Sequence, residues 1–236
     1  MPMREHHPHL QVRALSKRFG RTPVLEGVDL DVEAGEIFLL AGWNGSGKTT
    51  LLRCIAGLTR FEGEVLLDGT RFGRDMRSRK ALGYLPQVPG LPPWATPAEL
   101  LDLFGRLRDT STLPPELPER FLPPLGEPVG TLSGGQRQRL AIALTLLGSP
   151  TVLLLDEPAA NLDEPGRAGL ARILGKARAR GAAIVVAAPS PGDLAGVPST
   201  TGHLVDGRLR LDGPPGAAPA VGDATLAHLA IREVAG

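Results

Sequence analysis

The chain has 236 residues, with 26 basic and 25 acidic side chains, so its net charge is close to zero. This balance excludes the broad basic surface of many nucleic-acid-binding proteins, and we expect no nucleic-acid partner. A single cysteine, Cys54, excludes an intramolecular disulfide framework and is typical of a reducing cytoplasm. No apolar run approaches the roughly 20 residues of a membrane span, so any membrane-spanning part is expected from another chain.

The first third of the chain contains several short segments with strand character. After a polar tail at about residues 1–9, they cover residues 10–15, 24–32, 36–41, 62–67 and 81–85. Residues 36–41 are continuously apolar, which favours a buried strand, and we expect the other strands to be antiparallel and to surround it. The histidines of the tail could bind a metal, but a solvated tail is the simpler interpretation.

A glycine-rich motif follows the buried strand. Residues 42–49 read GWNGSGKT, which matches the phosphate-binding pattern G-x-x-x-x-G-K-[ST]. Glycines let consecutive backbone N–H groups turn toward an anion, Lys48 can reach the β- and γ-phosphates, and the Thr49 hydroxyl can bind Mg²⁺. A chance glycine-rich turn is the alternative, but residues 49–58 have helical spacing and would place a positive helix end beneath the phosphates. The predicted nucleotide-binding residues here are Gly42, Asn44, Gly45, Ser46, Gly47, Lys48, Thr49 and Thr50.

The middle of the chain, about residues 88–148, has the character of a small helical lobe. Thr96 and Glu99 form a capping box with proline between them at the first helical position, which predicts a helix over residues 97–108. Residues 113–124 contain too many prolines for a regular helix and predict a stiff connection. A second helix is expected over residues 134–147.

The last third alternates strands with helices, which predicts a mostly parallel sheet covered by helices on both faces. Apolar strands are expected at residues 151–155 and 183–188, and a strand pair at residues 202–211. Asp163 can cap a helix that runs to about residue 180. The fold class is therefore α/β.

Two acidic residues, Asp156 and Glu157, end the strand at residues 151–155. A carboxylate at the end of a buried strand beside a phosphate loop can hold the Mg²⁺ shell, directly or through water. The next carboxylate can polarise an attacking water molecule. The alternative is two acids that begin an ordinary loop, an interpretation that the phosphate loop makes much weaker.

The segment Leu132-Ser133-Gly134-Gly135-Gln136 is a second candidate anion site. Ser133 can cap the following helix, and the two glycines leave backbone N–H groups uncovered. A single domain rarely contains two phosphate-binding segments unless those of two copies meet across a dimer. A simple capped helix is the alternative.

In order along the chain, GWNGSGKT, GYLPQ, LSGGQRQRLAIA, TVLLLDEP and NLD resemble the motifs of the ATP-binding subunit of an ABC transporter. The similarity runs from about residue 10 to about residue 211. It implies a single domain over residues 1–236, with a RecA-like P-loop core and mostly parallel sheet, an N-terminal antiparallel β subdomain, the small helical lobe and a tail at about 213–236. The compact lobe and the GYLPQ motif also resemble those of the small ATPases of ABC-2-type and haem- or copper-maturation exporters.

The resemblance also implies roles for individual residues. Phe19 would stack on adenine, although it could instead be an ordinary core residue. Gln87 would contact Mg²⁺ and sense the membrane partner. Asp156 would be the Walker B carboxylate that serves the metal, Glu157 the general base, and Asp163 part of the loop that crosses the dimer interface.

The family further implies that ATP and Mg²⁺ join two such domains head to tail. Each ATP would lie between residues 42–49 of one subunit and residues 133–136 of a second copy or a paralogous ATPase. ABC transporter membrane subunits would bind this dimer at the cytoplasmic, inner face of the cell membrane, and Trp94 would either face them or pack inside the lobe. Soluble ABC ATPases of cofactor assembly, translation or repair are the rival interpretation.

One residue of the family pattern is missing. Relatives carry a switch histidine just after the strand that corresponds to residues 183–188, where this chain has Pro189 and Ser190. Losing one preorganised donor at the γ-phosphate costs roughly 10²–10³ in rate. We therefore predict slow hydrolysis with ATP binding largely kept, and Ser190 is the nearest hydroxyl that could substitute in part. A nucleotide-gated subunit of a heterodimer is the remaining alternative, and His203 is expected to be structural.

Overall fold

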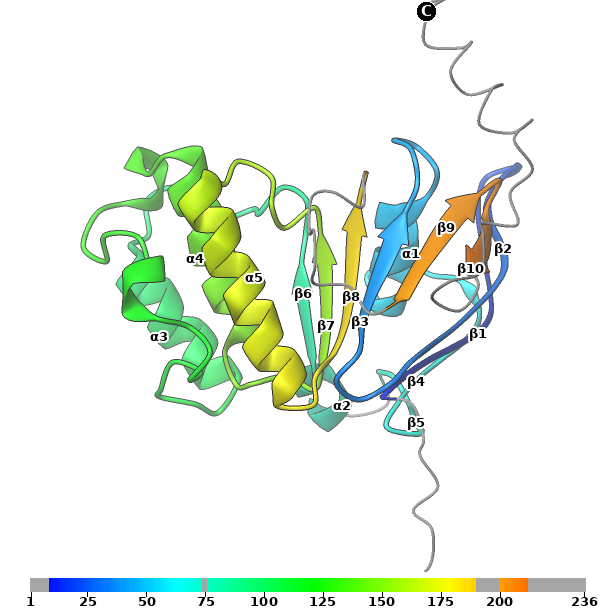
Figure 1. The fold of residues 1–236 in the computed structure, drawn as a ribbon, viewed down its shortest axis with the longest axis horizontal. Helices are drawn as coiled ribbons and strands as arrows, with labels where there is room; N and C mark the ends of the chain where they lie inside the picture. Colours follow the sequence, from blue (N-terminus) through cyan, green and yellow to red (C-terminus); the bar gives the residue numbers. More distant parts are fainter. Residues whose placement is uncertain (1–8, 74–75, 190–199, 212–236) are drawn as a thin grey trace, which may run out of the picture.

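The computed structural model describes residues 9–73, 76–189 and 200–211, and it contains two sheets (Figure 1). The larger sheet has the strand order β10-β9-β3-β8-β7-β6, and the smaller one has the order β2-β1-β4-β5. The strands of the larger sheet are β3 (Ile37–Ala41), β6 (Leu82–Leu85), β7 (Val152–Asp156), β8 (Ala183–Ala188), β9 (Thr200–Val205) and β10 (Arg208–Leu211). Those of the smaller sheet are β1 (Leu10–Phe19), β2 (Thr22–Val32), β4 (Glu62–Leu67) and β5 (Thr70–Arg71).

The larger sheet is parallel from β9 to β6, and only β10 runs antiparallel, beside β9. Strands β3, β7 and β8 are buried along their whole length, which explains their continuous apolar sequences. Because β8 lies between β3 and β7, the ends of these three strands meet at one edge of the sheet (Figure 1). This edge brings segments more than 100 residues apart in sequence close together.

Helices cover both faces of this sheet, as the sequence predicts. Helix α1 (Lys48–Ile55) packs its apolar side against β7 and β8 through residues such as Leu51 and Ile55. On the opposite face, α4 (Gly134–Leu146) and α5 (Glu164–Ala179) contribute Ile142, Leu170 and Ile173 to a second cluster. Alternate residues of each central strand enter one cluster or the other, because successive side chains of a strand point to opposite faces.

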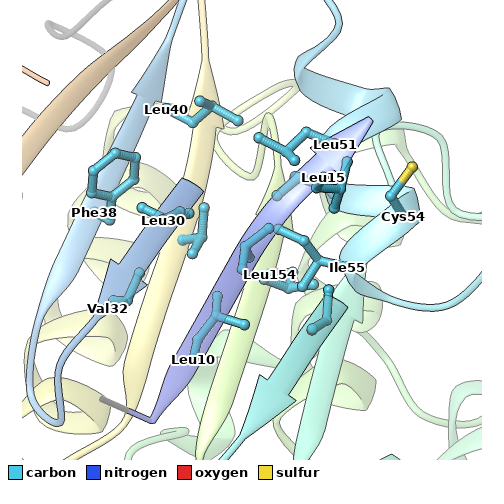
Figure 2. Packing of buried hydrophobic residues seen from close by; sticks show 14 of the residues in the cluster. Leu10, Leu15, Leu30, Val32, Phe38, Leu40, Leu51, Cys54, Ile55 and Leu154 are labelled. Carbon is cyan, nitrogen blue, oxygen red and sulfur yellow. The ribbon is translucent and has the colours of Figure 1, made fainter. Parts of the chain in front are cut away.

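The smaller sheet shares the core on the α1 side. Figure 2 shows side chains from β1 and β2, among them Leu10, Leu15 and Leu30, beside Leu51 of α1 and Leu154 of β7. Cys54 belongs to the same cluster and is fully buried. The antiparallel sheet therefore packs both onto the first helix and directly onto the parallel sheet, where β2 lies against β8 and β10, which confirms the predicted N-terminal β subdomain.

The helical lobe contains α3 (Pro97–Leu107) and the first part of α4, which pack together through Leu100, Leu140 and Leu144. The capping box at the start of α3 is present, because Thr96 accepts from the Glu99 N–H while Glu99 accepts from the Thr96 N–H. One short 3₁₀ helix, Glu119–Phe121, interrupts the proline-rich connection at residues 113–124, and a second, Val129–Thr131, lies between this connection and α4. None of the helices in the described part of the chain is long and apolar enough to cross a membrane.

The structure corrects one expectation about the strands. Residues 81–85 were expected to join the antiparallel group, but β6 lies parallel to β7 at the edge of the larger sheet, with Leu82 paired to Val152. The antiparallel strands also form a sheet of their own and do not flank β3 by hydrogen bonds. A short apolar run does not specify which strand it will pair with, and here the paired strand, β7, lies 70 residues further along the sequence. Strand β5 and helix α2 (Met76–Lys80) were not predicted.

Gly83 tests the packing between β6 and its neighbours. A Cβ atom there would lie 2.6 Å from the Thr145 carbonyl oxygen and 2.8 Å from a Leu153 methyl group. We expect Gly83→Ala to destabilise the protein by about 1–3 kcal/mol through overpacking. Gly175→Ala is the matched control, because the new Cβ meets nothing within 4 Å in α5, and it should stabilise by about 0.5–1 kcal/mol. Equal midpoints of chemical denaturation for the two variants would contradict this.

Cys54 offers a second test of the core. Burial raises the pKa of its thiol to about 11. At pH 8 only about one thiol in a thousand is then a reactive thiolate. We expect Ellman's reagent to label the folded protein far more slowly than the guanidinium-unfolded protein, and Cys54 is the only cysteine that can report. Labelling of the folded protein at the unfolded rate would show that α1 does not pack as described.

Candidate functional site

The candidate site begins with the loop of residues 42–49, which links β3 to α1. Gly42, Gly45 and Gly47 in this loop have positive φ angles, and the φ angles of Gly45 and Gly47 are 86° and 105°. A Cβ atom at Gly42 would lie 2.7 Å from the Ser46 hydroxyl oxygen, so only glycine fits there without rearrangement. The loop therefore has the strand, glycine turn and helix N-terminus that a phosphate cradle requires.

Lys48 lies in the first turn of α1 and is only 5% exposed. Its Nζ donates hydrogen bonds to the carbonyl oxygens of Gly42, at 2.5 Å, and Trp43, at 3.0 Å. Burial lowers the pKa of Lys48, and the negative charges of Glu157 and Asp156 oppose this change. The two carboxylates are thus electrostatic neighbours of Lys48, although they lie more than 100 residues away in sequence.

Asp156, the last residue of β7, is fully buried. Burial raises its pKa, while the nearby Thr49 hydroxyl opposes the rise without making a hydrogen bond of normal geometry. Both Asp156 carboxylate oxygens, and the Ser46 hydroxyl, lack a hydrogen-bond partner among the described residues. A buried charge without a partner is costly, and Mg²⁺ prefers one or two carboxylates together with phosphate oxygens. The donor set of Asp156 and Thr49 therefore fits a Mg²⁺ ion bound with a nucleotide.

Glu157 follows directly and has a φ of 50°, an uncommon value for a residue with a side chain. Its N–H donates to the Ala187 carbonyl oxygen of β8 at 2.9 Å. This bond extends the β7–β8 pairing by one residue, after which the chain turns away. Glu157 is half-buried, so part of the residue remains accessible.

The segment of residues 133–136 lies in the helical lobe and caps α4. Ser133 accepts a hydrogen bond from the Gln136 N–H at 3.2 Å, and the Gln136 side chain accepts one from the Ser133 N–H at 2.8 Å. Figure 1 shows the lobe beyond β6, whereas residues 42–49 lie between β3 and α1. The two candidate phosphate-binding segments, residues 42–49 and 133–136, thus belong to different parts of the fold. Gly134 and Gly135 face Asn161 of the loop after Glu157.

Several contacts of that loop were missed from sequence. Buried Gln138 donates to the Pro158 carbonyl oxygen, and Arg139 forms an ion pair with Asp163. Asp163 also caps α5, as predicted, by accepting from the Gly166 N–H at 3.0 Å. The start of α4 reads GGQRQR, so no signal in the sequence set Gln138 and Arg139 apart from their polar neighbours.

Phe19 ends β1 and is 55% exposed, so the alternative of an ordinary core residue is wrong. The Lys17 ammonium group lies 4.6 Å from its ring centroid. Phe19 borders a cavity of about 570 Å³ that Thr50 and Arg53 of α1 also line. An exposed aromatic ring beside the helix of the phosphate loop is available for stacking.

The remaining predicted residues lie on the surface or outside the described residues. Gln87 is exposed two residues after β6, and Trp94 is 79% exposed, which contradicts its packing inside the lobe. Ser190 lies outside the described residues. His203 is half-buried in β9, where it pairs with Ala41 at the end of β3.

Comparison with known proteins agrees with this geometry. The family model described as ABC transporter matches residues 25–160, more than half of the chain. Phosphonates import ATP-binding protein PhnC 1 of Natronomonas pharaonis is 36% identical over 87% of this chain and 93% of that protein. Cytochrome c biogenesis ATP-binding export protein CcmA of Xanthomonas campestris is 39% identical over 78% of this chain and 88% of that protein.

Other relatives are longer than the matched region. Nod factor export ATP-binding protein I of Ralstonia nicotianae is 38% identical over 68% of this chain, and the match spans 53% of that protein. The match to the human phospholipid-transporting ATPase ABCA3 spans 13% of that protein. The chain thus covers about half or less of some of the relatives that it matches.

Solved structures show the same fold. An ATP-binding subunit of an ABC transporter aligns with a TM-score of 0.75 and 26% identity over 94% of both chains. A dimeric, post-hydrolysis ATP-binding cassette bound to ADP and Pi aligns with a TM-score of 0.74 and 26% identity, over 88% of this chain and 100% of the other. With its phosphate loop, its acidic strand end and these similarities, the chain belongs to the ABC transporter family and has the fold of its ATP-binding domains.

Proposed function

We propose that this chain binds ATP with Mg²⁺, dimerises head to tail and hydrolyses ATP to drive the membrane subunits of an ABC transporter. The observation that carries the proposal is the buried Asp156 carboxylate, which makes no hydrogen bond of normal geometry with any described residue and lies near Thr49 and Lys48. Such a group is stable beside a cation. The phosphate loop next to it would bind the phosphates, which are the anionic part of that complex.

The phosphate loop would hold the nucleotide through its backbone N–H groups and Lys48. The ammonium group of Lys48 now donates to two carbonyl oxygens of the loop itself, and it would exchange these for phosphate oxygens. Thr49, Asp156 and Gln87 are the proposed residues around Mg²⁺, which supplies charge neutralisation on the phosphates when bound. Phe19 would support the adenine ring.

Glu157 is the proposed general base. Its position directly after Asp156 places a second carboxylate at the same edge of the sheet, near Lys48. There it would accept a proton from the attacking water. Lys48 would stabilise the negative charge that develops on the transferred phosphoryl group.

The segment of residues 133–136 would complete the nucleotide site of a second subunit. It lies on the lobe and presents a helix N-terminus, an arrangement suited to an anion from outside the chain. The solved relative that is dimeric and bound to ADP and Pi supports a nucleotide-bound dimer. Asp163 would lie at the same interface. Exposed Val88 and Trp94 would contact a membrane subunit at the inner face of the membrane.

Slow turnover is part of the proposal because the segment directly after β8, residues 189–193, reads PSPGD and contains no histidine. The second candidate is a subunit that binds ATP but hardly hydrolyses it and pairs with a competent paralogue. The same missing histidine favours this candidate. Substrate and direction of transport would be set by the membrane subunits.

Glu157→Gln tests the general base. We expect Mg²⁺-ATP turnover to fall at least about 10²-fold, while ATP binding remains and the dimer with ATP becomes detectable by light scattering. Glu164→Gln, an exposed acid of α5, is the matched control and should turn over like the parent. Undiminished turnover of Glu157→Gln would exclude Glu157 as the base. If the parent and variant both dimerise on ATP but neither hydrolyses it, the second candidate holds.

Phe19→Ala tests the adenine contact. Loss of stacking on one base is worth about 1–3 kcal/mol, so ATP affinity should fall about 5- to 150-fold. Phe19→Trp should retain affinity because it keeps an aromatic face. Inorganic triphosphate is the control ligand, since it has no base, and its affinity should not change. An equal loss for both ligands in equilibrium binding would show that Phe19 only supports the fold.

A further inference from the structure

The loop of residues 157–163, which links β7 to α5, has an uncommon backbone. Glu157 and Asn161 both have positive φ, at 50° and 62°, although neither is glycine. Left-handed residues with side chains persist only where the surroundings hold them. Within the loop itself, the Ala160 and Leu162 N–H groups donate to the Glu157 and Ala159 carbonyl oxygens. Such short-range bonds alone are a weak restraint, so other contacts must hold the loop.

Helix α4 supplies those contacts. Gln138 is only 2% exposed, and its Nε2 donates to the carbonyl oxygen of buried Pro158 at 3.1 Å. Pro158 follows Glu157 directly, and a proline has no N–H of its own to bond. Among the described contacts between α4 and this loop, this hydrogen bond is the nearest in sequence to the proposed base, Glu157.

Two further contacts join the same helix to the same loop. A Cβ atom at Gly135 would lie 2.8 Å from the Asn161 carbonyl oxygen, so the two backbones are in close approach. Arg139 Nη2 lies 3.2 Å from Asp163 Oδ1. Residues 135, 138 and 139 share one face of a helix because they are spaced by three and four. One face of α4 thus follows the loop from its beginning to its end.

We propose that Gln138 is a positioning residue, which holds residues 157–163 against α4 and thereby sets where the Glu157 carboxylate lies. This inference rests on the proposed role of Glu157 as the base. The buried amide gives the Pro158 carbonyl its donor, and a carboxylate or an apolar side chain cannot do so at neutral pH. A base displaced by as little as 1 Å loses about 10²-fold in rate. Because Gln138 does not line the phosphate loop, binding of ATP should not depend on it.

Two variants separate this role from general packing. Gln138→Met keeps the length and volume of the side chain but removes the donor. Gln138→Glu keeps the shape and places a carboxylate against the Pro158 carbonyl oxygen. Thr145→Val is the matched control, because Thr145 is also buried in α4. Its hydroxyl donates to the carbonyl oxygens of Ala141 in the same helix and of Tyr84, and not to the loop of residues 157–163. All three should be compared with the parent in turnover, ATP affinity and amide hydrogen exchange.

For both Gln138 variants we expect kcat to fall about 10- to 100-fold, with ATP dissociation constants within twofold of the parent. The amides of Ala160 and Leu162 should exchange about 5- to 10-fold faster. Thr145→Val should match the parent in all three measurements. An unchanged kcat, or a loss of ATP affinity as large as the loss of kcat, would overturn the proposal.

Hydrogen exchange distinguishes this inference from the proposed function. If the parent shows no turnover, the proposed hydrolysis fails, yet faster exchange in the Gln138 variants would still show that α4 holds the loop. If exchange at residues 160 and 162 is unchanged while the parent hydrolyses ATP, the holding role of Gln138 is wrong although the function stands. A folded Gln138→Met protein, verified by its unfolding midpoint, is required for either conclusion.

Discussion

The uncompensated charge of Asp156 is the constraint on which the site depends. A carboxylate that is fully buried and has no donor among the described residues is unfavourable by several kcal/mol unless a cation or a proton joins it. The order of the parallel strands creates this situation, because β7 ends one strand away from β3. Lys48, in the phosphate loop, partly offsets this charge, and the two carboxylates in turn oppose the fall in the Lys48 pKa that burial causes. Burial and charge together suit this edge to the proposed complex of Mg²⁺ with a nucleotide.

Helix α1 connects this edge to the rest of the molecule. Its N-terminus forms the phosphate loop, and its apolar side contacts both the parallel sheet and the antiparallel strands β1 and β2. The antiparallel sheet also ends at Phe19, so the position of the proposed adenine contact is set by the same packing. A single cluster of buried side chains thus sets the position of the proposed adenine contact relative to the phosphate loop.

Helix α4 has a corresponding role on the other face. Its N-terminus is the segment proposed to meet the nucleotide of a second subunit, and its second turn contacts residues 158 and 163. A displacement of the lobe would therefore move the loop after Glu157 as well. Interior packing has low compressibility and transmits such displacements, which would connect the proposed dimer interface physically to the proposed base, Glu157.

The sequence by itself determined the features that depend on neighbouring residues. The strand, glycine loop and helix around residues 42–49, the caps at Thr96, Ser133 and Asp163, and the acidic end of the strand at Asp156 were all predicted correctly, because each follows from local spacing. Local patterns also predicted antiparallel strands in the first third and helices in the middle of the chain, and the family resemblance assigned them to a β subdomain and a helical lobe.

Only the tertiary structure decided which of these features meet. It placed β6 in the parallel sheet, exposed Phe19 and Trp94, buried Asp156 without a partner, and brought Gln138 to the Pro158 carbonyl. Periodicity indicates which face of an element is apolar, but it does not specify which element will cover that face. Strand order, burial and contacts between distant segments arise from packing the whole chain, and the chemistry of the site depends on them.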